Sequence, residues 1–197
     1  MTRSTGDLTR ERSLVERARS GDEEAFAALV TENSARVYGA LRRFGLDQQE
    51  AEEVAQEVFL RAWRALSRFE ARAQFSTWLY RIAFNEAQRR LARRPAPGAL
   101  SQAGDDDAIA ALPDTAGAGP QTRALEHEFQ QVLERALAQL PIDLRVAVVL
   151  RDIEGLSSEE SAGVTGIRQA AFKSRLHRGR MQLRALLEPY LRLEQGT

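Results

Sequence analysis

The chain has 197 residues, 43% of them hydrophobic, and its 28 basic residues balance 28 acidic ones. It contains no cysteine, which excludes disulfides and thiolate metal sites. The chain has no apolar stretch of about 20 residues that could span a membrane, and its N-terminus lacks a signal-peptide run, so we expect a soluble cytoplasmic protein of one or two small domains.

Helical periodicity dominates residues 1–94, the first predicted domain. A short helix from Leu14 to Ser20 is expected to end at a glycine, and Asp22 is placed to cap the next helix. Two further amphipathic helices follow, one after the turn GLDQQ and one after the loop RFEARAQF. Their apolar stripes include Trp63 and Trp78, which we therefore expect in the core.

Residues 95–122 have the composition of a flexible linker. Four prolines, four glycines and four aspartates occur here without any basic residue or sustained periodicity. The sequence therefore predicts an all-α fold of two small helical domains, 1–94 and 123–197, joined by a flexible tether.

The second domain shows the pattern of a helix-turn-helix. One amphipathic helix stops before Pro141, and a shorter one ends near Gly155. Ser157 and Glu160 have the spacing of a capping box, so a short helix should begin there. The turn TGI then separates it from a long helix that we expect to end near Leu187. Two helices joined by a tight glycine-containing turn are typical of DNA-binding domains, in which the second helix enters the major groove.

The stretch GIRQAAFKSRLHRGRMQLR, residues 166–184, carries six basic side chains and no acidic one. At 100° per residue the apolar side of this helix and its opposite side separate clearly. The apolar side holds Phe172, Leu176, Gly179, Leu183 and Leu187. The opposite side holds Lys173, Ser174, His177 and Arg178, with Arg175 on a flank. A basic helix face is usually just solvated, but the helix offers its cations no acidic partner, which favours DNA binding.

Two blocks resemble the bacterial RNA polymerase sigma factors. The block LPIDLRVAVVLRDIEGLSSEESAGVTGIRQAAFKSRLHRGRMQLRALL is similar to their promoter-binding C-terminal domain. The blocks EAFAALV and AEEVAQEVFLRAWRALSRFEARAQFSTWLYRIAFNEAQRRL are similar to their N-terminal core domain. The compact size is similar to the extracytoplasmic-function (ECF) class. This resemblance implies a non-catalytic subunit that binds core RNA polymerase and promoter DNA and is controlled by an anti-sigma factor.

The resemblance also assigns residues. Against the minus-thirty-five promoter element it places Lys173, Ser174, Arg175, His177 and Arg178. Against the minus-ten element, where a base is flipped out, it places Phe69, Arg72, Arg81, Asn85, Arg89 and Arg90. Against core polymerase it places Glu53, Gln56 and Glu57. From the residues alone, the acidic run that contains Glu53 and Glu57 is better interpreted as a solvated helix face.

The chain departs from the family pattern at three places. Ser161 stands where the family usually has isoleucine, so we expect packing space that a larger apolar side chain could fill. Ala170 and Ala171 replace the usual Gly-Thr opening of the recognition helix. The minus-ten loop, residues 70–74, lacks the usual glycine, so base preference cannot be transferred.

Other functions remain open at this stage. The chief alternative is a helix-turn-helix regulator that binds duplex DNA as a dimer without a sigma role, and a second is a helical adaptor that binds no nucleic acid. An enzyme is least expected, because there are only two histidines, no cysteine and no phosphate-cradling glycine loop. No cofactor, metal site or membrane insertion is predicted.

Overall fold

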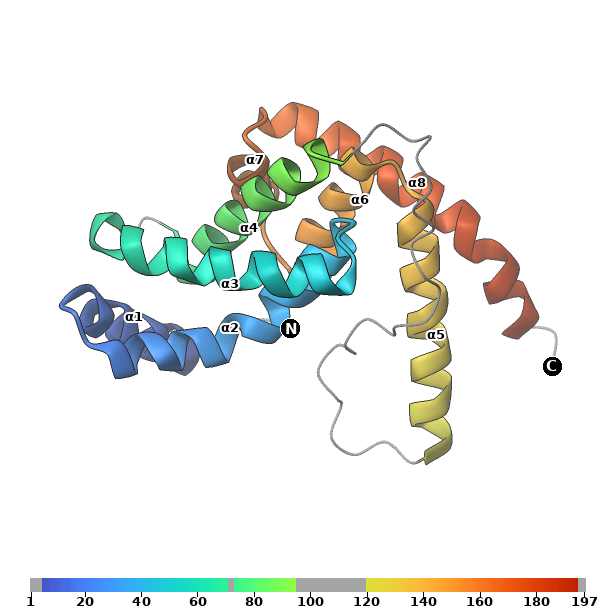
Figure 1. Cartoon of the computed structure of the whole chain (residues 1–197). Helices are drawn as coiled ribbons and strands as arrows, with labels where there is room; N and C mark the ends of the chain where they lie inside the picture. Colours follow the sequence, from blue (N-terminus) through green and yellow to red (C-terminus); the bar gives the residue numbers. More distant parts are fainter. Residues whose placement is uncertain (1–4, 71–72, 95–119, 195–197) are drawn as a thin grey trace.

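A computed structural model describes residues 5–70, 73–94 and 120–194, and within these ranges the only regular secondary structure is helical (Figure 1). The helices of the first domain are α1 (Thr5–Arg19), α2 (Glu23–Arg43), α3 (Gln48–Ala65), a 3-10 turn η1 (Leu66–Arg68) and α4 (Phe75–Ala92). Those of the second are α5 (Pro120–Gln139), α6 (Ile142–Val148), a π-helical turn η2 (Val149–Ile153), α7 (Ser158–Thr165) and α8 (Gln169–Glu194). The predicted all-α fold of two helical domains is confirmed.

Side-chain caps define several helix starts, as the sequence predicts. The Asp22 carboxylate accepts a hydrogen bond from the Ala25 amide at 3.0 Å. Ser157 and Glu160 form the predicted capping box, with each side chain accepting from the other residue's amide. The helix-turn-helix turn is confirmed too, because α7 ends at Gly166 in the left-handed conformation with φ 69°.

Two helices extend beyond their predicted limits. Helix α1 begins at Thr5 rather than near Leu14, and it is tied to the domain by the buried Glu11, whose carboxylate accepts from the Phe75 amide at the start of α4. Helix α8 continues through Pro189 to Glu194 instead of ending near Leu187. Proline has no backbone N–H to donate within a helix, but its fixed φ angle is compatible with helical backbone. Because Pro189 is exposed, water can hydrogen-bond the carbonyl group that is left without a partner.

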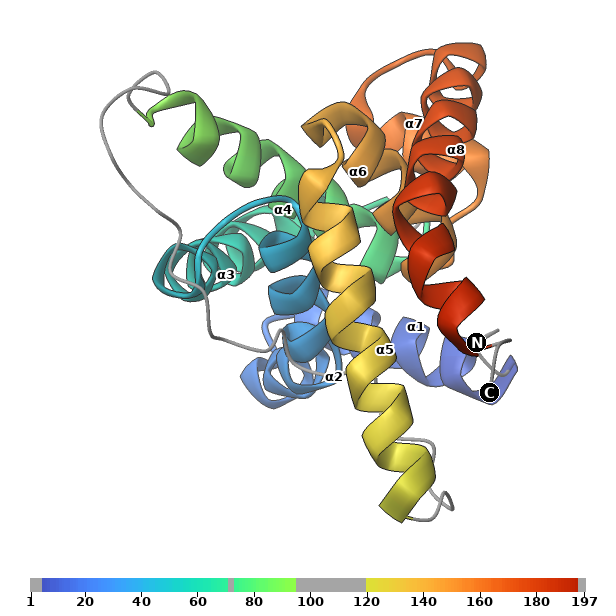
Figure 2. The ribbon, with the colours of Figure 1, turned by 90° about the vertical axis from the view of Figure 1, so that its right-hand side faces the viewer.

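The two domains pack against each other. Helix α7 lies along α4, and α5 passes between the first-domain helices and α8 (Figure 2). Valines and leucines of α6, η2, α7 and the loop between η2 and α7 belong to the same buried cluster as the first-domain core, namely Val146, Val149, Leu150, Leu156 and Val164. A second cluster, centred on Phe172 and Leu176, holds α8 to its own domain. We call this packing of α7 against α4 the closed arrangement.

Candidate nucleic-acid and polymerase interfaces

The recognition helix α8 divides into a buried and an exposed face, as the sequence predicts. Phe172 is fully buried and Leu176 is 6% exposed, whereas the four residues of the predicted DNA face all lie at the surface. These exposed residues are Lys173, Ser174, His177 and Arg178. The basic face of α8 is therefore available to a polyanion.

Two arginines on the flanks of α8 have acidic partners that the helix itself does not supply. Arg175, predicted to contact the minus-thirty-five element, lies 3.2 Å from Asp143 of α6. Arg180 donates to Asp152 of η2 at 2.9 Å, and this hydrogen bond raises the pKa of Arg180. Tertiary packing thus neutralises the flanks of the helix and leaves the outward face basic.

Two of the three departures from the family pattern lie on described helices. Ser161 is fully buried, and its hydroxyl donates to the Ser157 carbonyl at 2.8 Å. Neighbouring residues therefore enclose this side chain, and a gain in stability from a larger apolar side chain here stays a prediction. Ala170 and Ala171 are exposed in the first turn of α8. Of the loop 70–74, residues 71 and 72 lie outside the described residues.

A broad groove lies between the C-terminal half of α3 and the outer face of α4. It has a volume of about 520 Å³ and combines arginines with an aromatic and an amide side chain. Its polar and aromatic lining is Arg61, Arg64, Arg68, Trp78, Asn85 and Arg89, together with the acids Glu57 and Glu86. Arg61 lies 2.7 Å from Glu57 and 3.1 Å from Glu86, and Arg89 also pairs with Glu86. Arg61, Arg64 and Arg68 were missed in the sequence analysis, although their three- and four-residue spacing places them on one helix face. We call this the α3–α4 groove.

The structure brings together only some of the predicted minus-ten residues. Asn85 and Arg89 line the α3–α4 groove, and Arg81 is exposed elsewhere on α4. Phe69 is buried, with its ring 5.0 Å from that of Trp78. Arg72 lies outside the described residues.

Arg90 faces the acidic side of α3. It lies 3.2 Å from Glu50 and 2.7 Å from Glu53, and Arg94 also pairs with Glu50. Burial alone would raise the pKa of Glu50, but hydrogen bonds from Arg94, from the Asp47 amide and from Arg90 outweigh it and hold this pKa below its usual value. The same contacts with Glu50 and Glu53 raise the pKa of Arg90. The acidic run of α3 therefore joins α3 to α4 as well as meeting solvent.

An apolar groove lies on the other side of α3, against α2. Gln56, one of the predicted polymerase contacts, lines it together with aromatic and aliphatic side chains. The rings of Phe26 and Trp63 pack at 4.8 Å, and Leu60 is 50% exposed at the groove edge. Of the other predicted contacts, Glu57 pairs with Arg61 at 2.7 Å. We call this the α2–α3 groove.

Within the described residues, no helix is long and apolar enough to cross a membrane. In the same part of the chain, no group of three or more histidine, aspartate or glutamate residues could hold a metal ion.

An all-helical protein with a helix-turn-helix and a basic outward recognition helix belongs to the class of DNA-binding transcription factors. Comparison with known families makes this specific: sigma-70 region 2 matches residues 29–95, and sigma-70 region 4 matches residues 130–183. The chain is 40% identical to the RNA polymerase sigma-H factor of Pseudomonas aeruginosa, over 94% of this chain and 98% of that protein. It is 35% identical to the ECF RNA polymerase sigma-E factor of Escherichia coli K12, over 91% and 95% respectively.

Two solved structures share the fold. CnrH in complex with the cytosolic domain of CnrY aligns with a TM-score of 0.64 and 27% identity, over 91% of this chain and 98% of that one. The sigma factor RpoE from Bartonella quintana, in complex with the anti-sigma factor NepR, aligns with a TM-score of 0.63 and 24% identity, over 83% and 96%, which shows the fold alone. The chain belongs to the ECF sigma factors, which are transcription initiation factors and not enzymes.

Proposed function

We propose that this sigma factor binds core RNA polymerase in the cytoplasm and selects promoters by reading two separate DNA elements. The observation that carries the proposal is the two-sided recognition helix: Phe172 and Leu176 are buried while His177 and Arg178 are exposed. In this proposal α8 enters the major groove at the minus-thirty-five element. An arginine that reaches a guanine edge there contributes about 1–3 kcal/mol of discrimination.

The α3–α4 groove is the proposed site for the minus-ten strand. Arg64 and Arg68 can pair with phosphates, whereas Arg61 and Arg89 already pair with Glu86 of the same groove. The exposed amide of Asn85 can hydrogen-bond a base. Extrusion of a base costs a few kcal/mol of stacking, which such a lined groove can offset. Because Phe69 packs beneath Trp78, we assign it to the support of that indole rather than to direct stacking on a base.

The α2–α3 groove is the proposed docking site for core polymerase. Its lining is mostly apolar, with the polar Gln56 at the edge. The half-exposed Leu60 offers apolar surface to a partner. Such a mixture of apolar centre and polar rim is typical of specific protein interfaces.

We further propose that an anti-sigma protein restrains this chain. The support comes from a solved structure of a similar protein, CnrH in complex with the cytosolic domain of CnrY. The bound partner would have to cover at least one of the surfaces described above.

Run-off transcription with purified core polymerase on a candidate promoter library tests the proposal. We expect specific transcripts only when both this chain and core polymerase are present, and weak binding to the same duplexes by the chain alone. Tight binding by the chain alone with no transcript would favour the alternative, a helix-turn-helix regulator without a sigma role. Phosphate contacts release counterions, so DNA binding by either a sigma factor or a helix-turn-helix regulator should weaken as salt is added. A DNA affinity that does not change with salt concentration would contradict both functions.

A further inference from the structure

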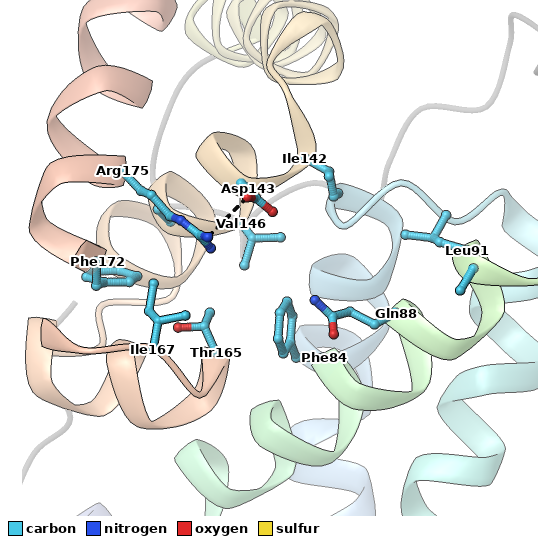
Figure 3. Close-up of a pocket in the computed structure, with 12 residues that line it drawn as sticks. Phe84, Gln88, Leu91, Ile142, Asp143, Val146, Thr165, Ile167, Phe172 and Arg175 are labelled. Carbon is cyan, nitrogen blue, oxygen red and sulfur yellow. Dashed lines mark ion pairs between the residues drawn. The ribbon is translucent and has the colours of Figure 1, made fainter. Parts of the chain in front are cut away.

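The recognition helix carries one arginine on each flank of its exposed basic face. At 100° per residue, Arg175 and Arg180 lie on opposite sides of that face. Arg175 lies 3.2 Å from Asp143, which is in the first turn of α6. Figure 3 shows this ion pair among the residues that line a cavity of about 300 Å³. The Arg175 side chain therefore runs from α8 toward α6.

The ion pair on the other flank has two hydrogen bonds. Nε of Arg180 donates to one oxygen of the Asp152 carboxylate at 2.9 Å, and a terminal nitrogen donates to the other oxygen. A bidentate pair of this kind fixes the orientation of a guanidinium as well as neutralising it. Asp143 and Asp152 belong to the same domain as α8, so both ion pairs are internal to the second domain.

The outward face of α8 differs from its flanks in this respect. Among the described residues, acids pair with Arg175 and Arg180 but with neither Lys173 nor Arg178. The two unpaired side chains are exposed on the face that is proposed to meet bases. The acids thus neutralise the flanks of α8 and leave its outward cations free.

The flanks of a helix in the major groove face the phosphates of the two DNA strands. The groove is about 12 Å wide, and a helix with its side chains is about as wide, so only its outward face meets base edges. Contacts with phosphates strengthen binding to DNA of any sequence and carry no sequence information. An arginine free on either flank would therefore add affinity without adding discrimination between bases.

We propose that Asp143 and Asp152 limit sequence-independent binding of α8 to DNA by holding Arg175 and Arg180 in ion pairs. A phosphate that recruits either arginine must break its ion pair, and the acid left behind repels the phosphate. Non-promoter sites outnumber promoters greatly in a genome, so a lower affinity for them leaves more sigma factor available to core polymerase. The inference rests on the proposed entry of α8 into the major groove.

Binding of the full chain to a labelled duplex without promoter elements tests this restraint. Fluorescence anisotropy measures the affinity between about 50 and about 200 mM salt, where phosphate contacts have a strong effect. An exposed ion pair shifts an equilibrium only severalfold. We therefore expect Asp143→Asn and Asp152→Asn each to tighten binding about threefold to fivefold at about 0.1 M salt. For each arginine released, the slope of the logarithm of the binding constant against the logarithm of the salt concentration should steepen by about one.

Glu128→Gln is the matched control. It removes the same unit of negative charge from an exposed position on α5 of the same domain, so affinity and slope should stay near those of the wild type. An equal gain in Glu128→Gln would show an effect of net charge and overturn the proposal, as would unchanged binding in both aspartate variants. Circular dichroism checks that the variants are folded, and if Asp143→Asn loses its helicity, Asp152→Asn decides.

A double-mutant cycle tests whether the acid acts through its arginine. We expect Arg180→Ala alone to leave the affinity for this duplex near the wild-type value, because the arginine is already held by Asp152. In the Arg180→Ala background, the gain from Asp152→Asn should disappear, because no cation is released. A gain that persists there would overturn the proposal, since the acid would then act directly on DNA. A purely structural role of the pair would lower stability without tightening DNA binding.

Arg178→Ala separates this inference from the proposed function. If Arg178→Ala weakens DNA binding while the aspartate variants match the wild type, α8 binds DNA and only the restraint is wrong. If Arg178→Ala and both aspartate variants all bind like the wild type, the proposed entry of α8 into the major groove fails as well. Run-off transcription tests the sigma function independently, because a missing transcript leaves the affinities of the free chain unaffected.

Discussion

Gly179 of α8 lies directly against the backbone of Leu144 in α6. A β-carbon at position 179 would come within 2.9 Å of the Leu144 carbonyl oxygen and equally close to a methyl group of Val148. Neither backbone nor a packed valine can move away cheaply, so this glycine sets how closely the recognition helix approaches its domain.

We therefore expect Gly179→Ala to destabilise the protein. The overpacking should cost about 1–3 kcal/mol, which meets or exceeds the roughly 1 kcal/mol of helix propensity that alanine gains. Urea denaturation of the full chain measures the change. Gly163→Ala in α7 is the matched control, because no atom lies within 4 Å of its added β-carbon and the protein should become no less stable. A Gly179→Ala variant as stable as Gly163→Ala would refute the packing argument.

Arg178→Ala tests the outward face of α8. In complex with core polymerase we expect promoter affinity to fall by about 1–3 kcal/mol if Arg178 contacts a base edge. If Arg178 contacts a phosphate instead, the slope of the logarithm of the binding constant against the logarithm of the salt concentration should become shallower by about one, for all promoters. Gln182→Ala, an exposed change on the same helix, should do neither. Wild-type affinity and salt slope in Arg178→Ala would remove this residue from the interface.

Arg64→Ala tests the α3–α4 groove. The residue is exposed at the groove wall, so its loss should leave stability nearly unchanged and weaken binding of a single-stranded minus-ten oligonucleotide by the polymerase complex. Arg93→Ala, at the exposed end of α4 and outside the groove, is the control of equal charge. Equal losses for both variants would indicate a general effect of charge rather than a site.

Leu60→Asp tests the α2–α3 groove. Half of this side chain is already in water, so the change should leave the fold intact, and a charge at the groove edge should weaken binding of core polymerase severalfold. Ala35→Asp adds the same charge at an exposed position of α2 outside the groove. Titration of labelled chain with core polymerase measures both, and the docking proposal fails if the two variants bind equally well.

Because of the ion pairs between α3 and α4, we expect part of the free energy of unfolding to depend on pH in the acid range. The pKa of Glu50 is lowered from 4.5 in the folded protein, so its ionised form stabilises the fold above that pH. This contribution falls away as the pH drops below 4.5 and through the lowered pKa. Comparison of Glu50→Gln with the wild type by urea denaturation should therefore show a difference at neutral pH that shrinks in acid. A difference independent of pH would contradict this origin.

Local patterns in the sequence were sufficient to predict the helices and the exposed basic face of α8. The helical period separates Phe172 and Leu176 from His177 and Arg178, and the capping pair Ser157 and Glu160 marks the start of α7. These features depend on residues within one or two turns, and backbone geometry relates such residues directly.

Contacts between helices could not be predicted in the same way. The partners of Arg90 lie on α3, 40 and 37 residues away, and those of Arg175 and Arg180 lie on other elements of the second domain. The arginines at the α3–α4 groove wall had a visible spacing, but only the packing of α4 against α3 turns that helix face into a groove.

The sequence by itself determined that this protein is all-helical, that it has two domains, and which face of the recognition helix is basic. Only the tertiary structure decided that the domains close on each other and that Glu154 meets Tyr80 across 74 residues of chain. The physical reason is one of range: periodicity and capping act between near neighbours, whereas the burial of a charge among distant donors depends on how whole helices pack.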